Sequence, residues 1–471
     1  MVNFVGRWRE LKELDRAYAS ARSEFIPIYG RRRVGKSELI LRFMAGKPGV
    51  YYLGKQSPSD LQVNEFLAEA ARALDMPLLA SLRLDDWQQA LLTVVDQWSQ
   101  THPERKLILA LDEFQWLAAA RPSVISELQH CWDRHWRSAG NVVLIVCGSY
   151  LGFMERDVLG KASPLFGRRT AQIHLQPFGY QEAAAFHPRW SVADQARAYF
   201  LVGGVPQYLL CLDDTSSIAI NIRRHMLDEF SPLFHEPTFL LREELREVAP
   251  YHAVLFAIAS GERTIGAIAG ATGLPERNMH YYVQQLAGLG YIERYHPLDG
   301  RRNPRQLRLR INDPLLKFSF RFVFPNTSIL RSAGTDRAFS ERIAPALDAY
   351  FGGCFEQLCR EALPAVYAHE GVGAGFEIGE YWSKETQIDL VGLRDDNWTD
   401  LGECKWGGFG SARTLERELE GKISRYPNAR GATLGRRFFV RRKPAAKASA
   451  RGWYSLEDLY ALPRPADGEP G

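Results

Sequence analysis

Residues 24–43, "EFIPIYGRRRVGKSELILRF", constrain the fold more than any other part of the chain. The apolar run at 25–29 predicts a buried strand, and "SELILRF" predicts the start of a helix. Between them, residues 30–37 match the pattern G-x-x-x-x-G-K-S/T in full. A glycine-rich turn between a strand and a helix directs backbone N–H groups and the helix N-terminus toward a phosphate. The stretch therefore predicts a phosphate-binding loop at the edge of a helix-covered sheet.

The residue types of this loop assign a role to each position. We expect Lys36 to bind the β and γ phosphates of a nucleoside triphosphate, and Ser37 to ligate Mg²⁺. The rest of the loop is expected to contribute to nucleotide binding through Gly30, Arg31, Arg32, Arg33, Val34 and Gly35.

Two further apolar runs predict strands of the same sheet. "KLILALDEFQWL" (106–117) ends in an acid pair and resembles a Walker B motif, so that Asp112 would hold Mg²⁺ through water and Glu113 would polarise the attacking water. "NVVLIVCGSY" (141–150) ends in a small polar step, where Ser149 either senses the γ phosphate or forms a plain turn. Strands that alternate with helices predict a parallel sheet with ligands at the carboxyl ends of its strands.

Length and composition bound the remaining possibilities. A chain of 471 residues predicts about two to four domains. No apolar run is long enough to span a membrane, and the charged N-terminus "MVNFVGRWRELKEL" has no apolar core of a signal peptide. The six cysteines lack paired metal spacing and indicate reduced thiols in a cytoplasmic protein without membrane association.

The middle of the chain changes to short amphipathic segments. Three of them, at 251–261, 264–273 and 274–292, predict helices, and 305–311 alternates leucine or isoleucine with arginine as a strand does. Three helices followed by a basic hairpin is the winged-helix arrangement. In a DNA-binding domain of this kind, helix 275–288 would enter a major groove and phosphates of double-stranded DNA would contact Arg301, Arg302 and Arg305. The alternative is a winged helix that serves as a packing module or lid.

The C-terminal part pairs carboxylates with a lysine. A helix at 349–368 carries Glu356, and residues 376–406 predict consecutive strands. Glu403 and Lys405 are two residues apart and share a face of their strand, and Asp389 is expected on the strand beside them. Such a cluster suits one or two Mg²⁺ ions for phosphodiester hydrolysis. A nucleic-acid-binding fold without cleavage and a structural salt bridge are the two alternatives.

A basic segment follows this cluster. Residues 436–451, "RRFFVRRKPAAKASAR", hold seven basic residues and no acid, although the net charge of the whole chain is only +4. The segment is expected to contact a nucleic-acid backbone or to form an ordinary solvated face.

Six motifs occur in the order found in one known family: "FVGRWREL", "GRRRVGKSEL", "LALDEFQWL", "CGSY", "LFGRRTAQIHLQPF" and "LVGGVPQYL". Over residues 3–330 the chain resembles the archaeal-type AAA ATPases, which are related to the STAND class of P-loop NTPase switches. The resemblance implies ATP and Mg²⁺ as cofactors and ATP hydrolysis as an activity. It also implies that the base lies near Gly6 and Arg7, that Arg168 or Arg169 reaches the γ phosphate, and that a lid begins at Gly204 and Pro206.

Residues 340–460 resemble the PD-(D/E)XK nuclease superfamily through Asp389, Glu403 and Lys405. The resemblance implies a metal shell of Mg²⁺, or of Mn²⁺, held by Asp389 and Glu403 and completed by Glu356. Many relatives carry a further acid where this chain has Gln387.

The predicted fold class is therefore a multidomain α/β protein. Its parts are a P-loop ATPase core with a parallel sheet (1–190), a helical lid (191–248), a winged helix-turn-helix (249–325), a restriction-endonuclease-like domain (340–460) and a disordered tail (461–471). The predicted function is an ATPase that binds DNA and cleaves nucleic acid with its last domain. The alternative is an ATP-dependent switch or DNA-binding regulator with an inactive nuclease fold. Assembly into a homo-oligomer is left open.

Overall fold

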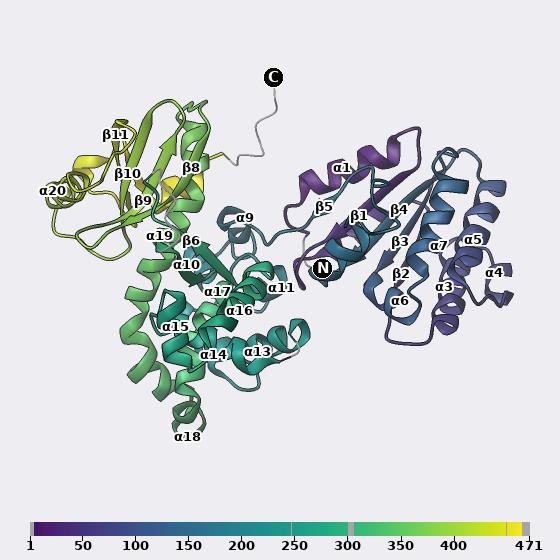
Figure 1. Cartoon of the computed structure of the whole chain (residues 1–471), viewed down its shortest axis with the longest axis horizontal. Coiled ribbons are helices and arrows are strands. Elements are labelled where there is room, and N and C mark those ends of the chain that lie inside the picture. The colour runs from purple at the N-terminus through teal and green to yellow at the C-terminus, as the bar shows by residue number, and fades with distance from the viewer. Residues whose placement is uncertain (1–3, 246, 300–305, 449, 464–471) are drawn as a thin grey trace. The chain divides into compact units, whose positions relative to one another are not determined.

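The computed structural model describes residues 4–245, 247–299, 306–448 and 450–463, and the chain divides into two compact units (Figure 1). The first unit is Met1–Pro177 and the second is Phe178–Gly471. The predicted phosphate contacts Arg301, Arg302 and Arg305 lie outside the described residues, as does most of the predicted tail, 464–471.

A five-stranded parallel sheet forms the centre of the first unit. Its strand order is β2-β3-β4-β1-β5, so β4 separates the strand before the phosphate-binding loop from the strand that ends in Asp112. The predicted parallel sheet is thereby confirmed. The strands are β1 (Glu24–Tyr29), β2 (Gly49–Leu53), β3 (Leu107–Asp112), β4 (Val142–Gly148) and β5 (Ile173–His174).

Helices cover both faces of this sheet because its strands are apolar on both sides. Consecutive residues such as Ile108 and Leu109 point to opposite faces and belong to two different cores. One core lies under α1 and α2, and the other lies under α3, α5, α6 and α7. Strands that are buried on both faces read as continuous apolar runs, which is how β1, β3 and β4 read in the sequence. The helical elements are α1 (Trp8–Ala19), α2 (Lys36–Met44), α3 (Ser59–Ala73), α4 (Leu78–Ser81), α5 (Trp87–Thr101), α6 (Phe114–Ala120), α7 (Val124–Cys131), η1 (Trp132–Trp136), α8 (Leu151–Phe153) and η2 (Met154–Val158).

The second unit begins with a helical region. Its first helix, α9, packs Tyr180 and Ala183 into the same core as Ala196 and Leu201 of α10. This packing is why the boundary between the two units lies after Pro177, earlier than the expected boundary at 190. The elements of the region are α9 (Tyr180–Ala184), α10 (Val192–Val202), α11 (Pro206–Leu209), α12 (Ile218–Asn221), η3 (Ile222–Leu227) and α13 (Pro232–Glu244).

Three helices and a two-stranded antiparallel hairpin follow in the predicted order. They are α14 (Val248–Ala259), α15 (Ile265–Thr272), α16 (Glu276–Gly288), β6 (Ile292–Tyr295) and β7 (Arg308–Ile311). Leu309 and Ile311 are buried, as the alternating pattern predicted, but the arginines of β7 are only partly exposed. The Arg308 guanidinium lies 4.4 Å from the centre of the Trp382 ring, and Arg310 forms ion pairs with Glu293 and Glu380. The outer face of the hairpin therefore packs on the C-terminal sheet.

The segment at 325–340, which lies between the predicted winged helix-turn-helix and the predicted C-terminal domain, is helical. Gly334 has a φ of 82° and breaks α18, after which the chain continues into the long helix α19. The elements here are α17 (Pro314–Phe318), η5 (Ser319–Val323), η6 (Phe324–Asn326), α18 (Thr327–Ala338), η7 (Phe339–Ile343) and α19 (Ala344–His369).

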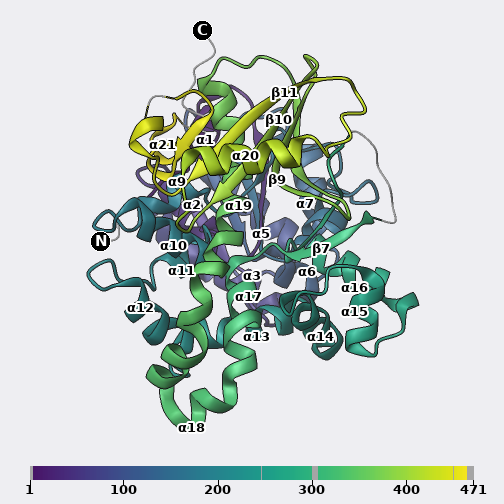
Figure 2. The same ribbon diagram turned by 90° about the vertical axis from the view of Figure 1, so that its left-hand side faces the viewer.

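A second five-stranded sheet, of order β12-β11-β10-β9-β8, forms the C-terminal part. Strands β8, β9 and β10 pair antiparallel, while β10, β11 and β12 pair parallel. Helices α19 and α20 cover opposite faces of this sheet (Figure 2). The elements are β8 (Phe376–Trp382), β9 (Gln387–Arg394), β10 (Trp398–Lys405), α20 (Ala412–Ile423), β11 (Thr433–Val440), η8 (Ala445–Lys447), β12 (Trp453–Ser455) and α21 (Leu456–Ala461).

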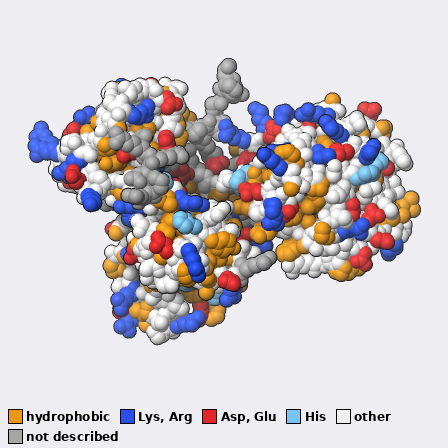
Figure 3. All heavy atoms as spheres, in the orientation of Figure 1, with side chains coloured by type: hydrophobic (Ala, Val, Ile, Leu, Met, Phe, Trp, Pro, Cys, Tyr) orange, Lys and Arg blue, Asp and Glu red, His pale blue; other side chains and the backbone are white. Residues whose placement is uncertain are grey.

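The distribution of charge and the character of the helices complete the description. On the face of each unit that Figure 3 shows, basic and acidic side chains are interspersed. Among the described residues, no helix has both the length and the apolar character needed to cross a membrane.

Candidate functional site

The phosphate-binding loop depends on glycine at Gly30. A Cβ atom at this position would lie 2.2 Å from the backbone oxygen of Leu175, far inside van der Waals contact. Gly35 has a φ of 90°, a conformation that glycine adopts without strain, and it caps the N-terminus of α2. Both glycines of the motif are therefore required by the backbone itself.

Lys36 lies in the first turn of α2 and is buried. Its Nζ donates hydrogen bonds of 2.9 Å to the backbone oxygens of Gly30 and of Arg31. Burial lowers the pKa of the Lys36 ammonium group, and the carboxylates of Glu113 and Asp112 act in the opposite direction. The ammonium group is thus held against the first two residues of the loop that it is expected to serve.

Ser37 and Asp112 meet although they are 75 residues apart in the chain. The Ser37 hydroxyl donates a 2.6 Å hydrogen bond to Asp112 Oδ2, and Tyr51 at the end of β2 donates a second one of 2.7 Å to the same oxygen. Asp112 is fully buried, and the burial of Tyr51, followed by the charge of Asp112, raises the pKa of the Tyr51 hydroxyl. The two predicted magnesium ligands therefore lie in direct contact.

Glu113 occupies a strained backbone position. Its φ of 49° and ψ of 43° place it in the left-handed region, from which α6 begins. Ser149 at the end of β4 donates a 2.8 Å hydrogen bond to Glu113 Oε2, and Gln115 donates to the same oxygen. The structure brings the predicted water-polarising carboxylate and the predicted γ-phosphate sensor together.

Arg7 connects the N-terminal segment to the loop. It has a φ of 62° and follows Gly6, whose φ is 64°. The buried guanidinium donates to the backbone oxygen of Val34 at 3.1 Å and to that of Gln176 at 2.7 Å. Gly6 and Arg7 thus lie beside the loop. Within the loop, Val34 is fully buried, and the half-buried arginines are Arg31, Arg32 and Arg33.

Arg168 is engaged away from the loop. Its guanidinium forms a two-pronged ion pair with Asp133 of η1, through Nε at 2.9 Å and NH2 at 2.7 Å. NH1 donates to the backbone oxygens of Pro164 and Phe166. Its neighbour Arg169 is exposed.

The expected lid residues belong to the second unit. Gly204 allows very close packing, because a Cβ atom there would lie 1.7 Å from the backbone oxygen of Phe178. Pro206 occupies the first turn of α11. A contact of either residue with a nucleotide stays a prediction.

In the C-terminal sheet, Asp389 and Glu403 lie on the adjacent antiparallel strands β9 and β10, one step beyond the paired residues Leu390 and Gly402. Asp389 Oδ2 accepts a 3.0 Å hydrogen bond from the backbone N–H of Cys404. Burial, followed by the charge of Glu403, raises the pKa of Asp389 to about 6. The predicted convergence of the two carboxylates is present.

The surroundings of Glu403 differ from the predicted metal shell. One of its oxygens lies 2.8 Å from Lys405 Nζ, and the other lies 2.5 Å from Nζ of Lys422 on α20. Glu403 is 1% exposed, so both oxygens are already neutralised by ammonium groups. The sequence predicted the lysine on the same strand and missed the one on the helix.

Glu356 interacts electrostatically with Asp389 from α19, the helix on the opposite face of the sheet from α20. It belongs to α19, which packs on Leu390 and Cys404, whereas Glu403 shares its face with Leu401 under α20. Burial, followed by the charge of Asp389, raises the pKa of Glu356 to about 7. In the described part of the chain, no three His, Cys, Asp or Glu side chains are grouped so as to hold a metal ion. The expected shell of Glu356, Asp389 and Glu403 is therefore not assembled among the described residues.

The basic segment at 436–451 is largely neutralised by acids from other parts of the chain. Arg437 is buried against Asp400 and Glu370, and Arg436 pairs with Glu420. Lys443 and Lys447 also form ion pairs, with Asp458 and Glu416. The expected continuous basic face is thus interrupted by these acids.

Comparison with known proteins assigns the N-terminal region. Residues 4–212 match the family model described as an ATPase domain predominantly from Archaea. This stretch is an archaeal-type ATPase domain. An uncharacterized protein of Methanocaldococcus jannaschii is 29% identical over 407 residues, which cover 86% of this chain and 87% of that protein. An uncharacterized ATP-binding protein of the same organism is 45% identical over 47 residues, covering 10% of this chain and 80% of that protein.

Two further findings complete the comparison. The Walker-type ATPase of Pyrococcus abyssi has a similar fold, with a TM-score of 0.50 and 17% identity over 68% of this chain and 96% of that one. Residues 319–417, which contain Glu356, Asp389, Glu403 and Lys405, match a family described as archaeal and bacterial proteins of unknown function.

The structure adds residues to the site of the ATPase domain that sequence reasoning missed. Gln115 stands two positions after Glu113 in the same motif, and this proximity was the available signal. Tyr51 carries no comparable signal, because it reaches Asp112 only through the pairing of β2 with β3.

Proposed function

We propose that the ATPase domain hydrolyses ATP in a Mg²⁺-dependent reaction. The observation that carries the proposal is the 2.6 Å hydrogen bond between Ser37 of the phosphate-binding loop and Asp112 at the end of β3. It brings together two motifs that are far apart in the sequence and that serve one purpose in nucleotide hydrolysis.

Different side chains of the domain would bind the phosphates and activate the attacking water. Lys36, already directed at the loop by two backbone oxygens, would bind the β and γ phosphates. Glu113 would orient and polarise the attacking water, and Ser149 and Gln115 hold its carboxylate in place. The strained backbone at Glu113 is consistent with this role, since such strain concentrates at functional positions.

The donor set at Ser37 and Asp112 fits Mg²⁺. A hydroxyl and a carboxylate are hard oxygen ligands, which this ion prefers. When bound, the ion would neutralise charge on the phosphate oxygens.

The remaining nucleotide contacts follow from the resemblance to the family. Gly6 and Arg7 would lie near the base, since Arg7 contacts the loop backbone. Gly204 and Pro206 would form the start of the lid. Arg168 would have to leave Asp133 to reach a γ phosphate, whereas Arg169 is exposed.

Two substitutions test the ATPase proposal. Lys36→Ala is expected to abolish ATP binding, and Glu113→Gln is expected to retain binding while hydrolysis falls by about a hundredfold. Lys55→Ala, which removes an exposed lysine of the same unit, serves as the control. Full hydrolysis by the Glu113→Gln protein would contradict the assigned role.

A second function, nucleic-acid binding with cleavage by the C-terminal domain, rests on two observations. Helix α16 has an exposed face rich in side chains that read bases, and Asp389 and Glu403 lie side by side near Lys405. The exposed residues of α16 are Glu276, Arg277, Asn278, His280, Tyr281, Gln284, Gln285 and Gly288. In this proposal α14–α16 and the hairpin form a winged helix that binds double-stranded DNA, and the last sheet is a PD-(D/E)XK domain that uses Mg²⁺ or Mn²⁺.

The pairing of Glu403 with two lysines favours the alternative, an ATP-dependent switch of the STAND type with an inactive nuclease fold. Incubation of DNA and RNA with ATP and either Mg²⁺ or Mn²⁺ separates the two. Cleavage that is lost in Asp389→Asn supports the nuclease, and intact nucleic acid under all conditions supports the switch. Size-exclusion chromatography with and without ATP tests for a homo-oligomer.

A further inference from the structure

A cavity of about 450 Å³ lies within the second unit, between the middle helices and α19. On α19 its lining combines the small residues Ala346, Ala349 and Gly353 with larger side chains, and at Gly353 a Cβ atom would meet nothing within 4 Å. The opposite wall carries Arg263 after α14, Lys317 of α17 and Arg321 of η5. The cavity is therefore a cleft with a basic wall.

The charges that line this cleft do not cancel. Its five basic side chains, Arg263, Arg310, Lys317, Arg321 and Arg360, face two acidic ones, Glu356 and Glu380. Glu380 forms an ion pair with Arg310, so it is already neutralised within the lining.

The basic wall has little internal neutralisation. Among the described residues, no carboxylate lies within ion-pair distance of Arg263, Lys317 or Arg321. The Lys317 ammonium group contacts the Cys354 sulfur at 3.5 Å and the Tyr350 ring, and Arg321 donates to one backbone oxygen at 3.4 Å. Arg263, Lys317 and Arg321 thus face the cleft without an ion-pair partner among the described residues, and Glu356 is the acid of the lining that acts on Lys317.

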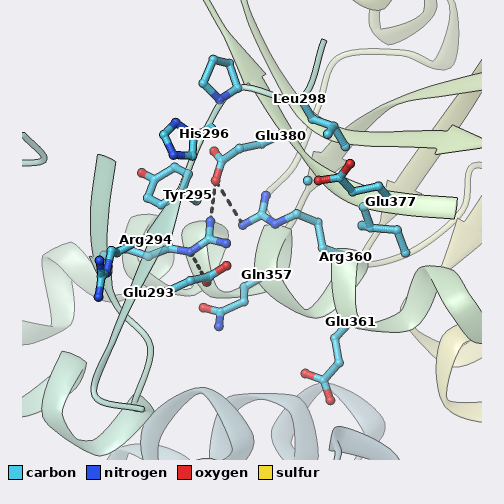
Figure 4. A pocket seen from close by; sticks show the side chains of 14 residues that line it. Glu293, Arg294, Tyr295, His296, Leu298, Gln357, Arg360, Glu361, Glu377 and Glu380 are labelled. Carbon is cyan, nitrogen blue, oxygen red and sulfur yellow. Dashed lines mark hydrogen bonds and ion pairs between the residues drawn. The ribbon is translucent and has the colours of Figure 1, made fainter. Parts of the chain in front are cut away.

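Arg360 connects this cleft to the predicted catalytic strand. Its side chain is 10% exposed, and its Nε has no hydrogen-bond partner among the described residues. NH1 donates a 2.6 Å hydrogen bond to the backbone oxygen of Asp389. Figure 4 shows the neighbouring cavity of about 590 Å³, in which Arg360 lies beside Glu380 and Gln357 on the wall shared by the two cavities. A buried guanidinium with an unused donor therefore stands next to Asp389.

We propose that this cleft binds the phosphate groups of a single nucleic-acid strand and directs the strand toward Asp389. The proposal rests on the proposed nucleic-acid function and names the binding surface for it. Separate cations along an open cleft suit the repeated charges of a phosphodiester backbone, and each contact releases counterions. Gln387, which lines the same cleft, stands two residues before Asp389 on β9.

The test compares charge reversals on the full-length chain. Arg263→Glu and Arg321→Glu change exposed side chains of the cleft, and Arg331→Glu makes the same change on the exposed surface of α18. Binding of a labelled single-stranded oligonucleotide is followed by fluorescence anisotropy over a range of salt concentrations. Each cleft variant is expected to raise Kd by about fivefold or more and to reduce the salt slope by about 0.7, whereas Arg331→Glu leaves both near the wild-type values.

The other outcomes overturn the proposal in distinguishable ways. If the cleft variants bind like Arg331→Glu, nucleic acid binds elsewhere and only the cleft is excluded. If thymidine monophosphate displaces the oligonucleotide as effectively as an unlabelled strand does, the cleft is a site for a small phosphate ester. If the wild-type chain binds no oligonucleotide, both the proposed nucleic-acid function and the proposed binding cleft are excluded. ATP hydrolysis measured without nucleic acid is expected to be unchanged in all three variants, which keeps the ATPase proposal separate.

Discussion

The Ser149 hydroxyl donates a 2.8 Å hydrogen bond to Glu113 Oε2, linking the tip of β4 to the residue that follows β3. Removing it in Ser149→Ala leaves the carboxylate with Gln115 alone. We expect kcat for ATP hydrolysis to fall by about tenfold with little change in KM, because the loss affects orientation rather than binding. Steady-state kinetics measure this, with the exposed Ser81→Ala as control. A change confined to KM would assign Ser149 to nucleotide binding.

Gly30→Ala is expected to disrupt the phosphate-binding loop. The added methyl group would lie 2.2 Å from the Leu175 oxygen, so either the loop or the chain after β5 must move. We expect a loss of about 2–4 kcal/mol in the free energy of unfolding, or loss of ATP binding where the loop gives way. Thermal unfolding and nucleotide titration read out the two cases. Gly152→Ala is the matched control, because its new methyl group meets only ordinary contacts.

Glu356 gives the second unit a pH-dependent stability. Its carboxyl keeps its proton in the folded chain up to about pH 7 but releases it near the ordinary value of 4.5 when unfolded. The folded state therefore binds more protons between these values, and the free energy of unfolding falls as pH rises through this window. In Glu356→Gln this decline between about pH 5 and pH 8 should shrink by on the order of 1 kcal/mol.

Urea unfolding at the two pH values checks this expectation. Asp348→Asn, an exposed acid on the same helix, should keep the wild-type pH dependence. An unchanged decline in Glu356→Gln would show that another group is responsible.

Lys422→Ala is expected to destabilise the C-terminal sheet. It leaves one oxygen of Glu403 without its cation in a position that is 1% exposed, at a cost of about 1–3 kcal/mol. The same change should raise the pKa of Asp389 further, since Lys422 lowers it in the wild-type chain. Chemical unfolding and carboxyl NMR titration report the two effects. Removal of the exposed Lys384 should alter neither.

The ATPase fold is predictable from sequence because its signals are continuous. The strand, loop and helix around Lys36 are consecutive, and β3 and β4 read as unbroken apolar runs. The sequence also predicts that Asp389 and Glu403 converge, since a short turn joins their strands. It does not predict Lys422, Tyr51 or the ion pair of Arg168 with Asp133, because each depends on how separate elements pack. Composition likewise cannot show that the acid-free segment at 436–451 finds its counter-charges elsewhere.

The contact of Arg310 with Glu380 joins a strand of the middle hairpin to a strand of the last sheet. Both side chains are largely buried, so cutting the chain between them would leave an unpaired charge on each fragment. The segment at 325–340, between the two predicted domains, is therefore a poor place to divide this protein. Fragments that end there should be prone to aggregation, and a useful dissection would separate the chain after Pro177 instead.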